Sequence, residues 1–199
     1  MQKIGLLGGT FDPVHNGHLI ISEYLRVELD LEQIWFIPIK KHPLKDNKDI
    51  SSPDVRLQML NLAIAGNPNF RSYDYEIRKQ GISFTIETLR ELKRSYQSHR
   101  PEFYFFIGMD NVNDLPKWKE PEEILQICQV VAFGRPGFQP SDRVKKYLPK
   151  IKFVQVPLLE ISSSFIRNRV QSGQSIRYLV PDSVGDYIIE KKLYQAASK

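Results

Sequence analysis

The residues most suited to chemistry lie near the start of the chain, where a short apolar run ends in two glycines and two histidines follow. Adjacent glycines let the backbone approach a phosphate without an intervening Cβ. His15 and His18 are three residues apart, so they share one face if a helix begins there, and its free N–H groups favour an anion. We therefore interpret this segment as a phosphate site formed by Gly8, Gly9, Thr10, Phe11, His15 and His18. The alternative is a turn set by Asp12-Pro13 with surface histidines.

A second polar segment lies near the other end of the chain, at Ser162-Ser163-Ser164-Phe165-Ile166-Arg167. A serine run at a helix start supplies an N-cap and hydroxyl groups, and Arg167 lies on the same helical face as Ser164. Hydroxyls, amide N–H groups and a guanidinium together can clamp a polyphosphate. The alternative is an ordinary serine N-cap beside a solvated arginine.

Alternating strand-like and helix-like segments must position these groups. The hydrophobic pattern predicts strands at 3–8, 33–39, 70–77, 102–107, 129–133 and 152–156, and helices at 17–29, 53–64, 85–96, 163–171 and 182–192. Strands separated by helices imply parallel βαβ units, so we expect an α/β fold: one doubly wound, mostly parallel, Rossmann-like sheet with helices on both faces. Ligands then bind beyond the carboxyl ends of the strands.

Length and composition limit the remaining possibilities. The 199 residues suit a single domain spanning 1–199, and the net charge of +5 suits an anionic small molecule because no basic run marks a nucleic-acid tract. The only cysteine, Cys128, lies in an apolar stretch, which excludes an intrachain disulfide and predicts a buried thiol. No apolar run is long enough for a signal peptide or a membrane span, so we expect a soluble, cytoplasmic protein.

The first segment resembles the His-x-Gly-His signature of the nucleotidyltransferase superfamily, and Ser163, Ser164 and Arg167 match its Ser-Ser/Thr-x-x-Arg element. That resemblance implies nucleotide transfer from a nucleoside triphosphate. His18 and His15 would contact the α-phosphate, and the second element would hold the β- and γ-phosphates. The spacing differs from the Gly-x-Gly-x-x-Gly fingerprint of dehydrogenases.

Further motifs lie at 81–89, 106–110, 115–118 and 135–137. With these motifs the chain, in order from Lys3 to Tyr194, is similar to the bacterial nicotinate-nucleotide adenylyltransferases. By this resemblance the loop Ser83-Phe84-Thr85 holds the pyridine carboxylate, Trp118 stacks on the pyridine ring, and Arg135 belongs to the same mononucleotide site. Gly108 and Asp110 lie at the nucleotide. The alternatives are a surface role for Trp118, a core role for Phe84 and a helix cap at Asp110.

One loop departs from the family, which usually has Pro-His-Lys or Pro-His-Arg after the second strand. This chain has Leu44 at the histidine position, whereas Lys45 keeps the positive charge, so Lys45 is assigned to ATP binding. His42 is a candidate substitute that is also consistent with a solvent-exposed residue.

The resemblance implies that the phosphate of nicotinate mononucleotide attacks the α-phosphorus of ATP, giving nicotinate adenine dinucleotide and pyrophosphate. Mg²⁺ would be held mainly by phosphates and water, because no paired carboxylates lie near either segment. The expected partners are ATP and nicotinate mononucleotide, with no nucleic acid and no membrane; a homo-oligomer stays open. Other readings are a nucleotidyltransferase for phosphopantetheine or nicotinamide mononucleotide, a nucleic-acid-binding module and a non-catalytic nucleotide sensor.

Overall fold

The computed structural model describes residues 2–40, 50–79, 81, 82, 84–134, 137, 139–157 and 159–195. Six strands form one sheet in the order β3-β2-β1-β4-β5-β6, and every neighbouring pair is parallel. This architecture confirms the predicted doubly wound α/β fold. The strands are β1 (Lys3–Gly9), β2 (Gln33–Pro38), β3 (Phe70–Ser72), β4 (Glu102–Gly108), β5 (Gln129–Gly134) and β6 (Ile151–Gln155).

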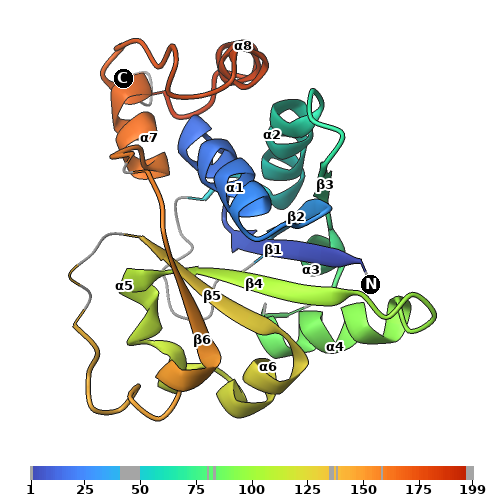
Figure 1. The fold of residues 1–199 in the computed structure, drawn as a ribbon. Coiled ribbons are helices and arrows are strands. Elements are labelled where there is room, and N and C mark those ends of the chain that lie inside the picture. Colours follow the sequence, from blue (N-terminus) through green and yellow to red (C-terminus); the bar gives the residue numbers. More distant parts are fainter. Residues whose placement is uncertain are drawn as a thin grey trace.

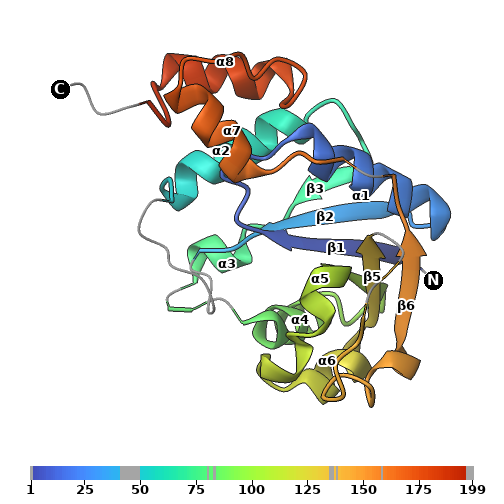
Figure 2. The ribbon, with the colours of Figure 1, turned by 90° about the vertical axis from the view of Figure 1, so that its left-hand side faces the viewer.

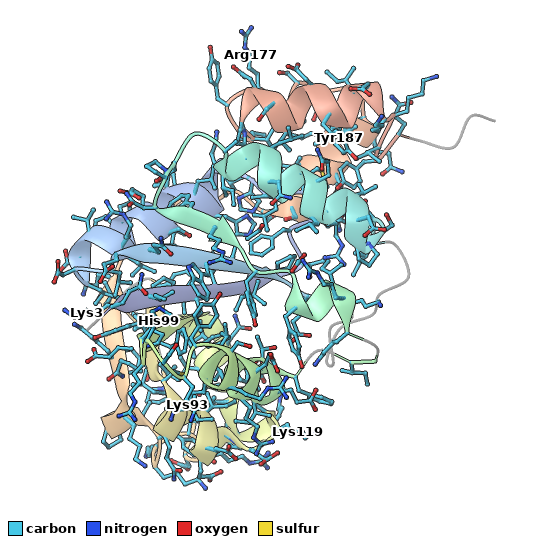
Figure 3. The ribbon with its side chains drawn as sticks, turned by 90° about the vertical axis from the view of Figure 1, so that its right-hand side faces the viewer. Lys3, Lys93, His99, Lys119, Arg177 and Tyr187 are labelled. Atoms are coloured by element: carbon cyan, nitrogen blue, oxygen red, sulfur yellow. The ribbon has the colours of Figure 1, made fainter. Side chains whose placement is uncertain are left out.

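Helices cover both faces of the sheet (Figures 1 and 2). One face carries α1 (Asn16–Glu28), α2 (Pro53–Ile64), α7 (Ser163–Gln171) and α8 (Asp182–Glu190); the other carries α4 (Thr85–Ser95), α5 (Met109–Val112) and α6 (Pro121–Ile127). The one-turn helix α3 (Tyr75–Arg78) and the 3-10 turns η1 (Leu115–Lys117) and η2 (Leu148–Lys150) complete the described elements. Figure 3 shows Lys93 and Lys119 on the side of the sheet opposite to Arg177 and Tyr187.

A hydrophobic core lies on each face of the sheet, because successive strand residues point to opposite sides. Ile4 and Leu6 of β1 pack with α4 and α6, whereas Leu7 packs with α1, α2 and α8. The central strands are buried on both faces, which explains why they appear in the sequence as continuous apolar runs.

The chain winds from β1 toward β2 and β3 on one side, and then continues through β4, β5 and β6 on the other. The change of direction falls between β1 and β4, whose carboxyl ends carry Gly9 and Gly108 (Figure 1). In open α/β sheets this switch point forms the crevice where ligands bind. Both β1 and β4 lead at this edge into the segments assigned to the nucleotide.

One local prediction was wrong, and one helix was missed. The segment 70–77 is a strand only as far as Ser72, and α3 follows, with the Glu76 side chain buried and bonded to Thr88 of α4. The helix α6 was not predicted, although Pro121 stands at its first position, where a proline needs no N–H partner. Cys128, just after α6, is buried as predicted, and burial raises the pKa of its thiol to about 12.

Candidate active site

The two histidines of the first segment lie at the N-terminus of α1, directly beyond the carboxyl end of β1. His15 is the N-cap residue and His18 the third helical residue. Their rings stack with centroids 3.6 Å apart and planes inclined by 27°, and the edge of Phe11 approaches His18 with a centroid distance of 5.1 Å. The two histidines therefore share one face, as predicted. They lie at the N-terminus of the helix, which favours anions.

One hydrogen bond determines which nitrogen of His18 holds the proton. The backbone N–H of His15 donates to Nδ1 of His18 at 3.2 Å. A neutral imidazole has one donor and one acceptor nitrogen, so Nε2 of His18 carries the proton. This arrangement makes Nε2–H a fixed donor for a phosphate oxygen.

Burial keeps both rings neutral in the free protein. It lowers the pKa of His15 to about 4, and it lowers the pKa of His18 well below its usual value, with the neighbouring His15 acting in the same direction. A bound polyphosphate has the opposite effect, because a nearby negative charge favours the protonated ring. The histidines can therefore donate hydrogen bonds as neutral groups and respond to an anion.

Glycines allow the close packing of this turn. A Cβ on Gly17 would lie 3.0 Å from Nδ1 of His15, and a Cβ on Gly9 would lie 2.9 Å from the Phe11 ring. At Gly8 the nearest atom would be 3.7 Å away, on Phe105, so protein packing does not require glycine there. Gly8 is exposed at the end of β1, and its bare backbone is open to a ligand.

The second segment lies against the first. Ser162 is the N-cap of α7, and its Oγ accepts from the N–H of Phe165 at 3.2 Å. The hydroxyl of Ser163 donates to the carbonyl of Pro13 at 2.9 Å, and a guanidinium N–H of Arg167 donates to the carbonyl of Asp12 at 2.8 Å. The fold thus joins two segments that are about 150 residues apart.

These bonds determine which hydrogen-bond donors at the start of α7 are left to bind a ligand. The Ser163 hydroxyl proton is already used, so the donors left at this end of α7 are the first backbone N–H groups, the Ser164 hydroxyl and the remaining N–H groups of Arg167. Ser164 is exposed, and its Oγ lies 3.2 Å from that of Ser162. Such a set of N–H, hydroxyl and guanidinium donors binds phosphate oxygens.

A buried arginine that the sequence analysis did not single out supports the turn. Arg56 of α2 is 1% exposed, and it donates to the carbonyls of Thr10 at 2.6 Å and Ser51 at 3.0 Å. Its position could have been found from helical periodicity, because Arg56 shares the inward face with Met59 and Leu60. A buried charge needs hydrogen-bonding partners, so an arginine at a core-facing position indicates buried acceptors.

Of the residues assigned to the pyridine, Phe84 and Trp118 pack against the core on the other face of the sheet. Phe84 is the N-cap of α4, and Thr85 is the first helical residue. The Phe84 side chain makes no cap bond. Trp118 is half-buried, and its ring meets Phe105 edge-on with centroids 6.0 Å apart. Nζ of Lys119 lies 4.7 Å from the centre of the Phe84 ring, which brings the Trp118 segment next to the start of α4.

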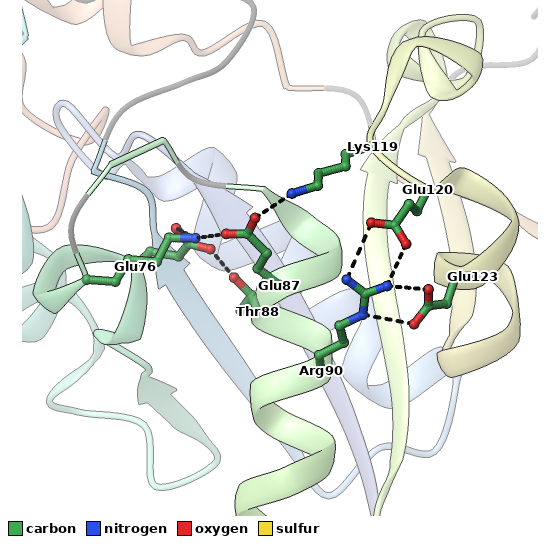
Figure 4. Close-up of polar contacts among 8 residues, drawn as sticks. Glu76, Glu87, Thr88, Arg90, Lys119, Glu120 and Glu123 are labelled. Atoms are coloured by element: carbon green, nitrogen blue, oxygen red, sulfur yellow. Dashed lines mark hydrogen bonds and ion pairs between the residues drawn. The ribbon is translucent and has the colours of Figure 1, made fainter.

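An ion-pair network holds these segments together (Figure 4). Each carboxylate oxygen of Glu87, in the first turn of α4, lies 2.8 Å from a lysine Nζ, of Lys79 on one side and Lys119 on the other. The two lysines lower the pKa of Glu87. Arg90 of α4 bridges to Glu120 and Glu123 near α6. The start of α4 is therefore fixed relative to the loop that carries Trp118.

Several assigned residues fall outside the described part. Lys45, Ser83 and Arg135 are not among the described residues, and of Asp110 only the backbone, within α5, is described. Gly108 ends β4 beside β1. In the described residues no group of three or more His, Cys, Asp and Glu could hold a metal ion, and none of their helices is long and apolar enough to cross a membrane.

Comparison with known proteins defines the class first. The model of the cytidylyltransferase-like family matches residues 6–169, a range that runs from β1 into α7 and includes both polar segments. A solved structure of Plasmodium falciparum nicotinic acid mononucleotide adenylyltransferase complexed with NaAD has the same fold. Its TM-score is 0.77 at 23% identity, and the likeness covers 98% of each chain.

Sequence relatives define the family more narrowly. A "Probable nicotinate-nucleotide adenylyltransferase" of Bacillus licheniformis is 43% identical over 98% of this chain and 100% of its own length. One from Geobacillus thermodenitrificans is 45% identical over 98% of this chain and 88% of its own. The chain belongs to the nicotinate-nucleotide adenylyltransferase family.

Proposed function

We propose that the chain transfers the adenylyl group of ATP to nicotinate mononucleotide, giving nicotinate adenine dinucleotide and pyrophosphate, a step of NAD biosynthesis. The observation that carries the proposal is the joining of the stacked histidines at α1 to the Ser163–Arg167 end of α7, at the switch point of the sheet. This arrangement supplies phosphate-binding donors from two directions. The relatives named above carry the same activity in their names.

The chemistry needs alignment and charge stabilisation rather than a protein nucleophile. The attacking oxygen belongs to the mononucleotide phosphate, which is already anionic at neutral pH, and pyrophosphate leaves from the α-phosphorus. His18 donates from Nε2 to an α-phosphate oxygen, and the backbone N–H of His15 holds the His18 ring through Nδ1. Backbone N–H groups of Ser163 and Ser164, with Arg167, hold the β- and γ-phosphates. The backbone of Gly8–Phe11 lines the same turn.

Magnesium fits this scheme as a companion of the triphosphate. The one carboxylate of the phosphate turn, Asp12, already accepts hydrogen bonds from Ser51 and Tyr194. The carbonyls of Thr10, Asp12 and Pro13 already accept hydrogen bonds from Arg56, Arg167 and Ser163. The donors at the turn bind phosphate rather than a cation. Mg²⁺ would thus be held mainly by ATP oxygens and water, where it neutralises phosphate charge. Lys45, Gly108 and Asp110 are proposed to contact ATP as the family resemblance implies.

The start of α4 accounts for the choice of the acid. The Phe84 side chain makes no cap bond, so the N-cap residue offers no side-chain acceptor to the first-turn N–H groups of Thr85 and Ile86. A carboxylate accepts with both oxygens, whereas an amide turns a donor toward one of these groups and leaves it unpaired, at a cost of about 1–3 kcal/mol. Trp118 would stack on the ring, and Ser83 and Arg135 complete the proposed mononucleotide site.

A pyrophosphate-release assay tests the proposal directly. With ATP and Mg²⁺, nicotinate mononucleotide should support turnover, and nicotinamide mononucleotide should do so with a kcat/KM lower by roughly tenfold to a hundredfold. Phosphopantetheine should support none. Equal rates with acid and amide would refute the carboxylate assignment, and no turnover with either would refute the function.

A further inference from the structure

The last described helix is followed by a tyrosine that reaches back to the phosphate turn. The hydroxyl of Tyr194 donates to Oδ1 of Asp12 at 2.6 Å, across 182 residues of sequence. Asp12 is 1% exposed, so this bond satisfies a carboxylate that has little access to water. Tyr194 itself packs against the core formed by α1, α2, α7 and α8.

The backbone after α8 adopts an unfavourable conformation to bring Tyr194 to this place. Lys192 and Tyr194 both have positive φ, of 50° and 59°, which residues with a Cβ rarely adopt. Such conformations persist where surrounding contacts over-determine them. Burial and the nearby Asp12 raise the pKa of the Tyr194 phenol above its usual value, so the hydroxyl remains a donor at working pH.

Asp12 joins groups on both sides of the triphosphate site. Its second carboxylate oxygen accepts from the N–H of Ser51 at 3.2 Å, and its carbonyl accepts from Arg167 at 2.8 Å. A shift of Asp12 would therefore move the turn that carries the histidines and the guanidinium of Arg167 together. None of these atoms is itself expected to react.

We propose that Tyr194 is a positioning residue for the adenylyl transfer: its hydroxyl holds Asp12, and through Asp12 it sets both the phosphate turn and Arg167. This inference rests on the proposed function. In this role Tyr194, which follows the last described helix, positions a turn near the start of the chain. The tyrosine does not touch the reacting atoms in this role.

The variant Tyr194→Phe removes the hydroxyl and keeps the ring. We expect kcat to fall about tenfold, equivalent to about 1.4 kcal/mol, and the Kd for ATP measured by calorimetry to rise several-fold. The KM for nicotinate mononucleotide should stay within about twofold, because Phe84 and Trp118, assigned to its pyridine ring, pack against the core on the other face of the sheet. A purely structural role would not produce this split between the two substrates.

Tyr147→Phe is the matched control. Its hydroxyl donates to Oε1 of Glu122 at 2.7 Å, so it also loses a phenol–carboxylate bond, but at a site remote from the phosphate turn. Tyr194→Phe should lose more stability in urea unfolding, because Asp12 is buried whereas the exposed Glu122 keeps Lys146 as a partner, and only Tyr194→Phe should lose ATP affinity and turnover. If Tyr194→Phe keeps both values within twofold, or both variants lose them equally, the inference is wrong.

Asp12→Ala removes the acceptor of the same bond and gives a second measurement of ATP binding if Tyr194→Phe does not fold. It should weaken ATP binding several-fold, and Tyr194→Phe should add little in its background; additive losses would contradict the coupling. Failure of the proposed function is distinguishable, because it appears as absent turnover in the unaltered protein. In that case the Kd for ATP of the two tyrosine variants still tests the positioning role.

Discussion

Acid should destabilise this protein through His15. The unfolded ring titrates near its usual pKa of 6.5, whereas burial lowers the pKa of the folded ring to about 4. Between these values the unfolded chain binds more protons, so the free energy of unfolding falls as pH falls. For one histidine the linkage relation gives a loss of about 2 kcal/mol between pH 7.5 and pH 5.0. His18, shifted in the same direction, adds to it.

The measurement is urea unfolding of the parent and of His15→Asn at the two pH values. Asparagine keeps a polar N-cap but has no titrating ring, so the variant should lose about 2 kcal/mol less than the parent over this interval. Ser164→Ala, an exposed position in the same site, serves as the control and should keep the parent's pH dependence. Equal losses for the parent and His15→Asn would mean that His15 is not held neutral by burial.

Three substitutions address turnover, each with a distinct outcome. His18→Ala should lower kcat by about two to three orders of magnitude with little change in Tm, as expected for the loss of a donor to a transition-state phosphate; near-normal turnover would remove His18 from the mechanism. Trp118→Ala should raise the KM for nicotinate mononucleotide several-fold and leave the KM for ATP unchanged; an equal effect on both would make Trp118 structural. Gly17→Ala should leave Tm within a few degrees, because alanine favours the helix by up to about 1 kcal/mol. Its kcat should nevertheless fall about tenfold, since the new Cβ would lie 3.0 Å from Nδ1 of His15, and full activity would show that the ring can move without cost.

Local features of the sequence carried much of the fold and part of the site. The helix predicted at 163–171 is α7 as observed, and the predicted strands at 3–8 and 102–107 differ from β1 and β4 by one residue at one end. These elements have strong apolar patterns and clear glycine or serine boundaries, which depend on neighbours in sequence. The pairing of His15 with His18 follows from helical spacing in the same way.

The tertiary structure alone decided which distant groups support that site. The bonds from Arg56 to Thr10, from Arg167 to Asp12 and from Tyr194 to Asp12 join residues 46, 155 and 182 positions apart. No periodicity relates such residues. Their partners are backbone carbonyls and a buried carboxylate, which exist as acceptors in need of donors only after the sheet and its helices have excluded water. Local sequence therefore determined the reactive groups and their immediate elements, and the packing of the two halves of the chain determined what holds them in place.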